Sequence, residues 1–168
     1  MIKLKIYVAG VFKSRSDCEQ VTKILTEHSG LFEVVGGCVG REDDVSTPQA
    51  LANDAERAFS ELTHAHVLVV IMADSQYHFR DALAEIGFAL GQHKRILILC
   101  PGSAEPIEPE RTRCEYYCQS NVFLYHPFIE HYNTLDGILQ RLKESISLAE
   151  PLTVIYGNHR SNQCSFSV

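Results

Sequence analysis

Short unbroken apolar runs alternate with helical patterns along most of this chain, which restricts its fold more than any other feature. The apolar runs predict strands at 3–9, 32–39, 67–72, 96–100 and 122–125. Apolar residues spaced three and four apart predict helices at 17–28, 48–64, 81–91, 110–119 and 134–148. This alternation predicts an α/β fold, a doubly wound parallel sheet of about five strands with helices on both faces, in a flavodoxin-like three-layer sandwich.

The length predicts one domain. Residues 1–150 carry the alternating pattern, whereas 151–168 read as a short extended piece and a polar C-terminal tail. With 45% hydrophobic and 21% charged residues, the 168-residue chain has the composition of a globular protein with a substantial core.

Charge and hydropathy exclude several classes of partner. The formal net charge of −6, with no cluster of lysine and arginine, argues against a nucleic acid polymer. No apolar stretch approaches the ~20 residues that span a membrane, and the N-terminus lacks the apolar core of a signal peptide, so we expect a cytoplasmic protein with no membrane partner. The cysteines form no short-domain disulfide framework, and we expect reduced thiols at Cys18, Cys38, Cys100, Cys114, Cys118 and Cys164.

The stretch 81–100 joins a helix directly to a buried strand and places Glu85 near the start of that helix. In open parallel sheets, ligands bind outside the carboxyl ends of the strands, where the following helices begin. Glu85 is therefore the first candidate for a functional residue, and an exposed helical carboxylate is the alternative.

Four stretches together resemble one enzyme family. They are the strand IYVAG, the helix with Asn53 and Asp54, the strand VLVVIM, and the block SQYHFRDALAEIGFALGQHKRILILC. These resemble the nucleoside 2-deoxyribosyltransferases and their relatives that hydrolyse the N-glycosidic bond of nucleoside 5′-monophosphates. The resemblance covers about residues 3–125, and its strongest part is Glu-Ile-Gly-Phe-Ala-Leu-Gly from Glu85 onward.

The resemblance implies roles for particular residues. Glu85 takes the place of the nucleophile, Asp54 that of a second carboxylate near the sugar, and Gly10 that of a loop against the nucleoside. Ser120 and Asn121 lie where phosphate-binding members use a serine. The family also forms dimers or higher homo-oligomers, so the helix at 48–64 and the C-terminal tail are interface candidates.

Two positions depart from the family pattern. His66 stands where an aspartate usually precedes the third strand, and Phe79 stands where another aspartate usually lies six residues before the glutamate. Asp81, four residues before Glu85, is either a substitute acid on the same helix face or a carboxylate favoured by the helix N-terminus.

The chemistry of N-glycosidic cleavage suits these residue types. Breaking the C1′–N bond passes through an oxocarbenium-like state, which a carboxylate stabilises or attacks to form a glycosyl-enzyme. The departing base needs a proton or hydrogen bonds, for which Asp54, Asp81 and His78 are candidates.

Other substrate contacts are less specific. Phe12 and Tyr77 are candidates for stacking on a base, as are Tyr7 and Phe79, and Arg15 is a candidate phosphate contact. No glycine-rich phosphate loop is present, and the spacing of Cys114 and Cys118 with the downstream histidines matches no known structural zinc site. We therefore expect neither a cofactor nor a metal.

The sequence thus predicts cleavage of the N-glycosidic bond of a (deoxy)nucleoside or nucleoside 5′-monophosphate, with water or a second base as acceptor. Two other functional hypotheses stay open. One is a TIR-like domain that binds or cleaves NAD or signals by self-association, and the other is an inactive nucleotide-binding module. The base, the sugar and the need for a 5′-phosphate are not encoded in any motif.

Overall fold

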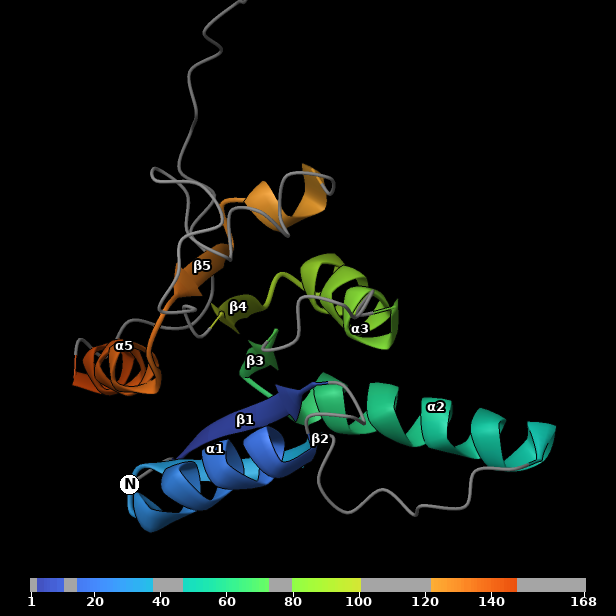
Figure 1. Cartoon of the computed structure of the whole chain (residues 1–168), viewed down its shortest axis with the longest axis horizontal. Coiled ribbons are helices and arrows are strands. Elements are labelled where there is room, and N and C mark those ends of the chain that lie inside the picture. Colours follow the sequence, from blue (N-terminus) through green and yellow to red (C-terminus); the bar gives the residue numbers. More distant parts are fainter. Residues whose placement is uncertain (1–2, 11–14, 38–46, 73–79, 101–121, 148–168) are drawn as a thin grey trace, which may run out of the picture.

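The structure is a computed structural model and describes residues 3–10, 15–37, 47–72, 80–100 and 122–147. Strands and helices alternate through the described ranges (Figure 1). In chain order the elements are β1 (Leu4–Ala9), α1 (Arg15–Glu27), β2 (Phe32–Gly37), α2 (Pro48–His64), β3 (Val67–Ile71), α3 (Arg80–Gly91), β4 (Arg95–Leu99), η2 (Val122–Tyr125), β5 (Ile129–Tyr132) and α5 (Leu135–Ser147).

The strands of the described ranges form one five-stranded parallel sheet in the order β2-β1-β3-β4-β5. This order confirms the predicted doubly wound, flavodoxin-like α/β fold. After β2 the chain crosses back over β1 and adds the later strands on the other side. The order therefore reverses between β1 and β3, and this is the switch point at which such folds bind ligands.

Helices cover both faces of the sheet, and each pair closes a separate apolar core (Figure 1). Leu62 of α2 and Ile86 of α3 are buried on one face. Leu25 of α1 and Leu142 of α5 are buried on the other. Residues of β3 and β4 point alternately into the two cores, which explains why these strands are continuous apolar runs.

The last strand was predicted wrongly. Residues 122–125 form the short 3₁₀ helix η2, in which Phe123 and Tyr125 are exposed, and β5 is the strand that pairs with β4. The N–H of His126 donates to the carbonyl of Phe123 at 3.2 Å, which closes the turn. Glu130 and His131 interrupt the apolar pattern of β5, as an edge strand with a single neighbour allows.

Helix α2 begins as predicted but is less buried than predicted. The hydroxyl of Thr47 accepts the N–H of Ala50 at 3.2 Å, and Pro48 takes the first helical position. The expected apolar stripe fails in the first half, where Leu51 is 57% exposed. Figure 1 shows α2 running past the end of β1, so this half has no sheet beneath it.

Other boundaries shift slightly. Helix α1 begins at Arg15, two residues before the predicted start at residue 17, and ends at Glu27. The predicted helix at 110–119 and the predicted tail at 151–168 lie outside the described residues. None of the helices in the described ranges is both long and apolar enough to cross a bilayer.

Cys18 contradicts the expectation of reduced thiols. It is fully buried on α1 and disulfide-bonded. The other cysteine in the described ranges, Cys100, is a buried free thiol. The spacing of cysteines along a sequence does not show which thiols the fold brings together.

Glu130 fastens α5 to the sheet edge. Its carboxylate accepts the hydroxyl of Tyr132 at 2.7 Å and the Nε–H of Arg141 at 2.9 Å, and the Nε of Arg95 lies 3.5 Å away. Partial burial alone would raise the pKa of Glu130, but the hydrogen bonds from Arg141 and Tyr132 and the two guanidinium charges outweigh burial and lower it. The folded state therefore favours the ionised carboxylate.

We expect Glu130→Gln to lower the free energy of unfolding at neutral pH by about 1 kcal/mol, a modest value because the site is partly exposed. A carboxyl group whose pKa is lowered by folding stabilises the protein above the unfolded pKa, near 4.5, and loses this contribution as pH falls through the folded pKa. Denaturant unfolding of both proteins at neutral and acidic pH measures the difference. An equal difference at both pH values would contradict this account.

Candidate active site

Glu85 is the charged residue that the fold buries within the part of the chain that the structure describes. Glu85 is 5% exposed. Of the polar and charged residues in the described ranges, Ser145 is the other one that is buried. Helix α3 runs back along the sheet from the carboxyl ends of the strands, so its early residues lie near that edge. Burying a carboxylate costs several kcal/mol unless it is hydrogen-bonded, so its place here calls for a partner.

Tyr7 of β1 is such a partner. Its hydroxyl donates to Oε1 of Glu85 at 2.7 Å, and the tyrosine residue is fully buried. The bond joins β1, which borders the switch point, to the helix that follows β3. A buried tyrosine has little rotational freedom, so its hydroxyl holds the carboxylate in one orientation.

The backbone beside Tyr7 is irregular. In the β1–β2 ladder Ile6 pairs with Val34, whereas Tyr7 pairs with Gly36, so Val35 is an extra residue on β2. Bulges of this kind occur next to active sites, where they redirect side chains. Gly36 and Gly37 follow directly, and a side chain at Gly36 would collide with Glu61 of α2. The two glycines let α2 and β1 approach β2 closely beside Tyr7.

This arrangement supplies an oriented carboxylate on the helix that leads away from the carboxyl ends of the strands. A carboxylate held by a neutral donor in a low-dielectric site interacts strongly with a positive charge that develops beside it. It can also attack an electrophilic carbon to form an ester. The geometry is therefore suited to chemistry with a cationic transition state.

The other predicted catalytic carboxylates lie on the helices around this edge. Asp54 is half-buried on α2 and forms an ion pair with Arg57, one turn along the same helix, at 2.5 Å. Asp81 is exposed in the first turn of α3, whereas Glu85 is buried one turn further on. The catalytic roles of both aspartates stay predictions, since neither the ion pair of Asp54 nor the exposed position of Asp81 identifies such a role.

The predicted substrate contacts are described only in part. Gly10 is half-buried and directly follows β1 at the carboxyl edge, and the backbone of Arg15 begins α1. The remaining predicted contacts lie outside the described residues, and they are Phe12, Tyr77, His78, Ser120 and Asn121.

His66, the first departure from the family pattern, lies away from the carboxyl edge. It precedes β3, and its backbone N–H donates to the carbonyl of Lys5 near the start of β1 at 2.8 Å. The end of β3 is five residues further on, or roughly 16 Å along a strand at about 3.3 Å per residue. His66 therefore does not stand where a carboxylate would join Glu85 at that edge. Phe79 lies outside the described residues.

Sequence reasoning missed the role of Tyr7, which we considered only for stacking. The signal was the tyrosine hydroxyl in the apolar part of the strand, residues 6–9 with the sequence IYVA. A buried tyrosine hydroxyl usually finds a hydrogen-bond partner, so a search for that partner among the buried carboxylates would have reached Glu85.

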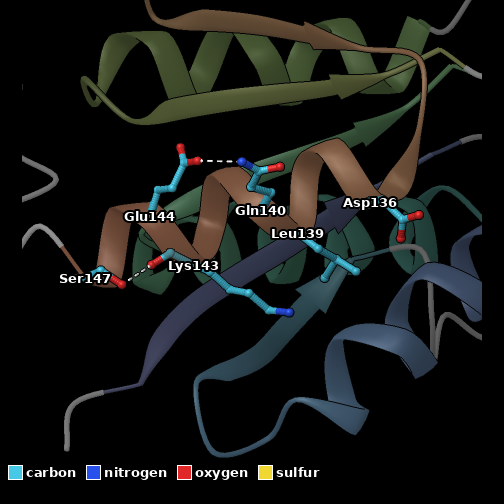
Figure 2. A pocket seen from close by; sticks show the side chains of 6 residues that line it. All are labelled: Asp136, Leu139, Gln140, Lys143, Glu144 and Ser147. Atoms are coloured by element: carbon cyan, nitrogen blue, oxygen red, sulfur yellow. Dashed lines mark hydrogen bonds between the residues drawn. The ribbon is translucent and has the colours of Figure 1, made fainter.

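A hollow elsewhere on the surface has no relation to Glu85. Figure 2 shows residues along α5, on the opposite face of the sheet, that border a volume of about 660 Å³. Its described lining consists of one helix face, namely Asp136, Leu139, Gln140, Lys143, Glu144 and Ser147. Within it Gln140 donates to Glu144 at 2.9 Å, and Ser147 donates to the carbonyl of Lys143 at 3.0 Å. We assign no chemistry to this face.

No protein-family model matches the sequence, and no curated protein matches it. Among solved structures, a CMP N-glycosidase of Clostridium botulinum matches over 83% of this chain and 98% of that chain. The two share 15% sequence identity, with a TM-score of 0.48. A likeness of this degree concerns the course of the backbone and says nothing of substrate or site residues.

Proposed function

We propose that this protein cleaves the N-glycosidic bond of a nucleoside or nucleoside 5′-monophosphate, with Glu85 as nucleophile. The observation that carries the proposal is the buried carboxylate of Glu85, held by the Tyr7 hydroxyl near the switch-point edge. A group that is costly to bury is retained most readily where function needs it. The resemblance of the segment around Glu85 to the deoxyribosyltransferases supplies the substrate class.

The reaction proceeds in two displacements. The ionised carboxylate of Glu85 attacks C1′ of the sugar, the C1′–N bond breaks, and the base leaves with the electron pair and takes up a proton. The acylal-type ester formed on Glu85 is then attacked at C1′ by water or by a second base, which releases the carboxylate. Asp54, Asp81 and His78 are our candidates for donating the proton.

The substrate contacts are part of the same proposal. Gly10, beside the end of β1, lies against the nucleoside, and the aromatic rings of Phe12 and Tyr77 stack on the base. Arg15, Ser120 and Asn121 bind a 5′-phosphate where the substrate carries one.

Release of free base tests the proposal. Nucleosides, 2′-deoxynucleosides, their 5′-monophosphates and NAD are each incubated with the native chain, with and without a second base, and the products are separated by chromatography. We expect base release from at least one nucleoside or nucleotide. Formation of a new nucleoside in the incubations with a second base would indicate a transferase, and its absence there would indicate a hydrolase. Cleavage of NAD alone would favour a TIR-like enzyme, and nucleotide binding without cleavage would favour an inactive module.

Tyr7→Phe is expected to lower kcat about 10- to 100-fold, because hydrogen bonds to a charged group contribute roughly 1.5–3 kcal/mol. The phenylalanine fills the same volume but leaves Oε1 of Glu85 without this donor. Since the bond orients the nucleophile and does not bind substrate, KM should change much less than kcat. Steady-state kinetics on the substrate found above measures both.

Tyr132→Phe is the matched control for Tyr7→Phe. It too removes a tyrosine hydroxyl that donates to a carboxylate at 2.7 Å, but at Glu130 on the edge strand β5. We expect Tyr132→Phe to keep native kcat. A folded Tyr7→Phe protein with native kcat would show that the hydroxyl does not position Glu85.

A homodimer or higher homo-oligomer belongs to the same proposal. The first half of α2, with Leu51 exposed, runs past the sheet and is our candidate interface. Sedimentation equilibrium of the native chain and of Leu51→Glu tests this expectation. We expect the native chain to associate and the variant to be monomeric, whereas a monomeric native chain would contradict it.

A further inference from the structure

The start of β1 is held by a histidine side chain at the amino ends of β1 and β3. The backbone N–H of Lys5 donates to Nδ1 of His66 at 3.0 Å, and the carbonyl of Lys5 accepts the N–H of His66 at 2.8 Å. In a longer parallel ladder a backbone carbonyl would take the first of these bonds. Here α2 ends at His64, just before β3, so the imidazole takes the place of that carbonyl.

The bond requires one protonation state of the ring. Nδ1 accepts a hydrogen bond only when it carries no proton, so a neutral His66 has its proton on Nε2. Protonation of Nδ1 would put two N–H donors face to face and leave the Lys5 N–H without this acceptor. A backbone donor that loses its partner away from water costs free energy.

The charged groups around the ring are mostly positive. Lys5 lies on β1, and Lys94, before β4, donates from Nζ to the carbonyl of Ala65 at 2.6 Å. Glu33 on β2 pairs with Lys5 and is the opposing negative charge. Burial, followed by the charges of Lys5 and Lys94, lowers the pKa of His66, and Glu33 raises it by less. His64 is exposed on α2, with Nδ1 at 2.7 Å from the Ser60 carbonyl.

We propose that His66 is a pH-dependent latch that closes the amino edge of the β1–β3 pair when its ring is neutral and opens it when Nδ1 is protonated. Strand β1 carries both Lys5, at the latch, and Tyr7, two residues further on, which holds Glu85. Acidification therefore loosens the start of the strand that positions the candidate nucleophile. The latch itself rests on the fold and not on the proposed reaction.

Amide hydrogen exchange of Lys5 in the full chain, measured by NMR at about pH 7.5 and about pH 5 and corrected for intrinsic rates, tests the latch. We expect native protection to fall by up to about tenfold per pH unit once the pH drops below 6.5, the pKa of an unperturbed ring, which is the limit for opening linked to one proton. His66→Asn should keep the same protection at both pH values, because an asparagine Oδ1 accepts the bond and does not titrate. His64→Asn should retain the native loss.

The latch is overturned if native protection of Lys5 is the same at both pH values, or if His66→Asn loses protection as the native chain does. A measurement on the native chain alone serves if the variant fails to fold. The ¹⁵N shifts of the His66 ring should report the Nε2–H form at about pH 7.5, and the folded ring should titrate at a lower pH than the pH at which Lys5 protection begins to fall. A Nδ1–H form at neutral pH would contradict the proposal.

Discussion

Glu85→Gln is expected to lower kcat for base release about a thousandfold or more, because an amide cannot act as the nucleophile and carries no charge to stabilise the oxocarbenium-like state. The replacement has nearly the same shape, and its Oε1 still accepts the Tyr7 hydroxyl. Removing a buried charge also offsets part of any lost contact, so the free energy of unfolding should change by less than about 1 kcal/mol. Steady-state kinetics and denaturant unfolding measure the two effects separately.

Two carboxylates serve as controls for Glu85→Gln. Glu130→Gln changes a partly buried carboxylate that, like Glu85, accepts a tyrosine hydroxyl, and it should leave kcat unchanged. Asp81→Asn separates the two carboxylates of α3, since Asp81 is exposed one turn before Glu85. Native kcat in a folded Glu85→Gln protein would show that Glu85 is not the nucleophile. A larger loss of kcat in Asp81→Asn than in Glu85→Gln would show the same.

Gly37→Ala is expected to lower the free energy of unfolding by about 3 kcal/mol or more, among the largest values for a single substitution. The φ angle of Gly37 is +130°, a conformation that favours glycine, and an added Cβ would lie 1.9 Å from the carbonyl oxygen of Val8. Since both groups belong to paired backbones, relief requires β1 and β2 to separate. Thermal unfolding should show a fall in Tm of about 6–12 °C.

Gly30→Ala is the matched control for Gly37→Ala. It lies between α1 and β2, has no positive φ angle, and has no atom within 4 Å of an added Cβ. Its effect on stability should therefore stay within about 0.5 kcal/mol. Equal Tm values for the Gly37→Ala and Gly30→Ala proteins would show that β2 does not pack against Val8 as described.

The strands and helices with the strongest patterns were predictable because their patterns reflect burial. β3 and residues 96–99 of β4 are covered on both faces, so these residues are uniformly apolar, and the cap at Thr47 marks the start of α2. The edge strand β5 was missed because it tolerates Glu130 and His131, and the apolar η2 was taken for it. The exposure of Leu51 depends on how far α2 extends beyond the sheet, and no local sequence pattern encodes this length.

Of the candidate site, the position of Glu85 could be predicted from the sequence, because the order of strands and helices determines it. A helix start after a central strand lies near the carboxyl edge in any doubly wound sheet, which singled out Glu85. The bond from Tyr7 joins residues 78 positions apart, and the bond from Lys5 to His66 joins residues 61 apart. Contacts of this range depend on strand order and register, which the sequence pattern does not specify.

Trapping the glycosyl-enzyme tests the role of Glu85 most directly. The native chain is incubated with a 2′-deoxy-2′-fluoro analogue of the substrate found above, whose fluorine slows release of the sugar, and is then quenched in acid and digested with trypsin. We predict a peptide of residues 81–94 that is heavier by one fluorinated sugar, with fragment masses placing the sugar on Glu85 and not on Asp81. A sugar on any other residue, or base release from the analogue with no adduct on the protein, would contradict Glu85 as the nucleophile.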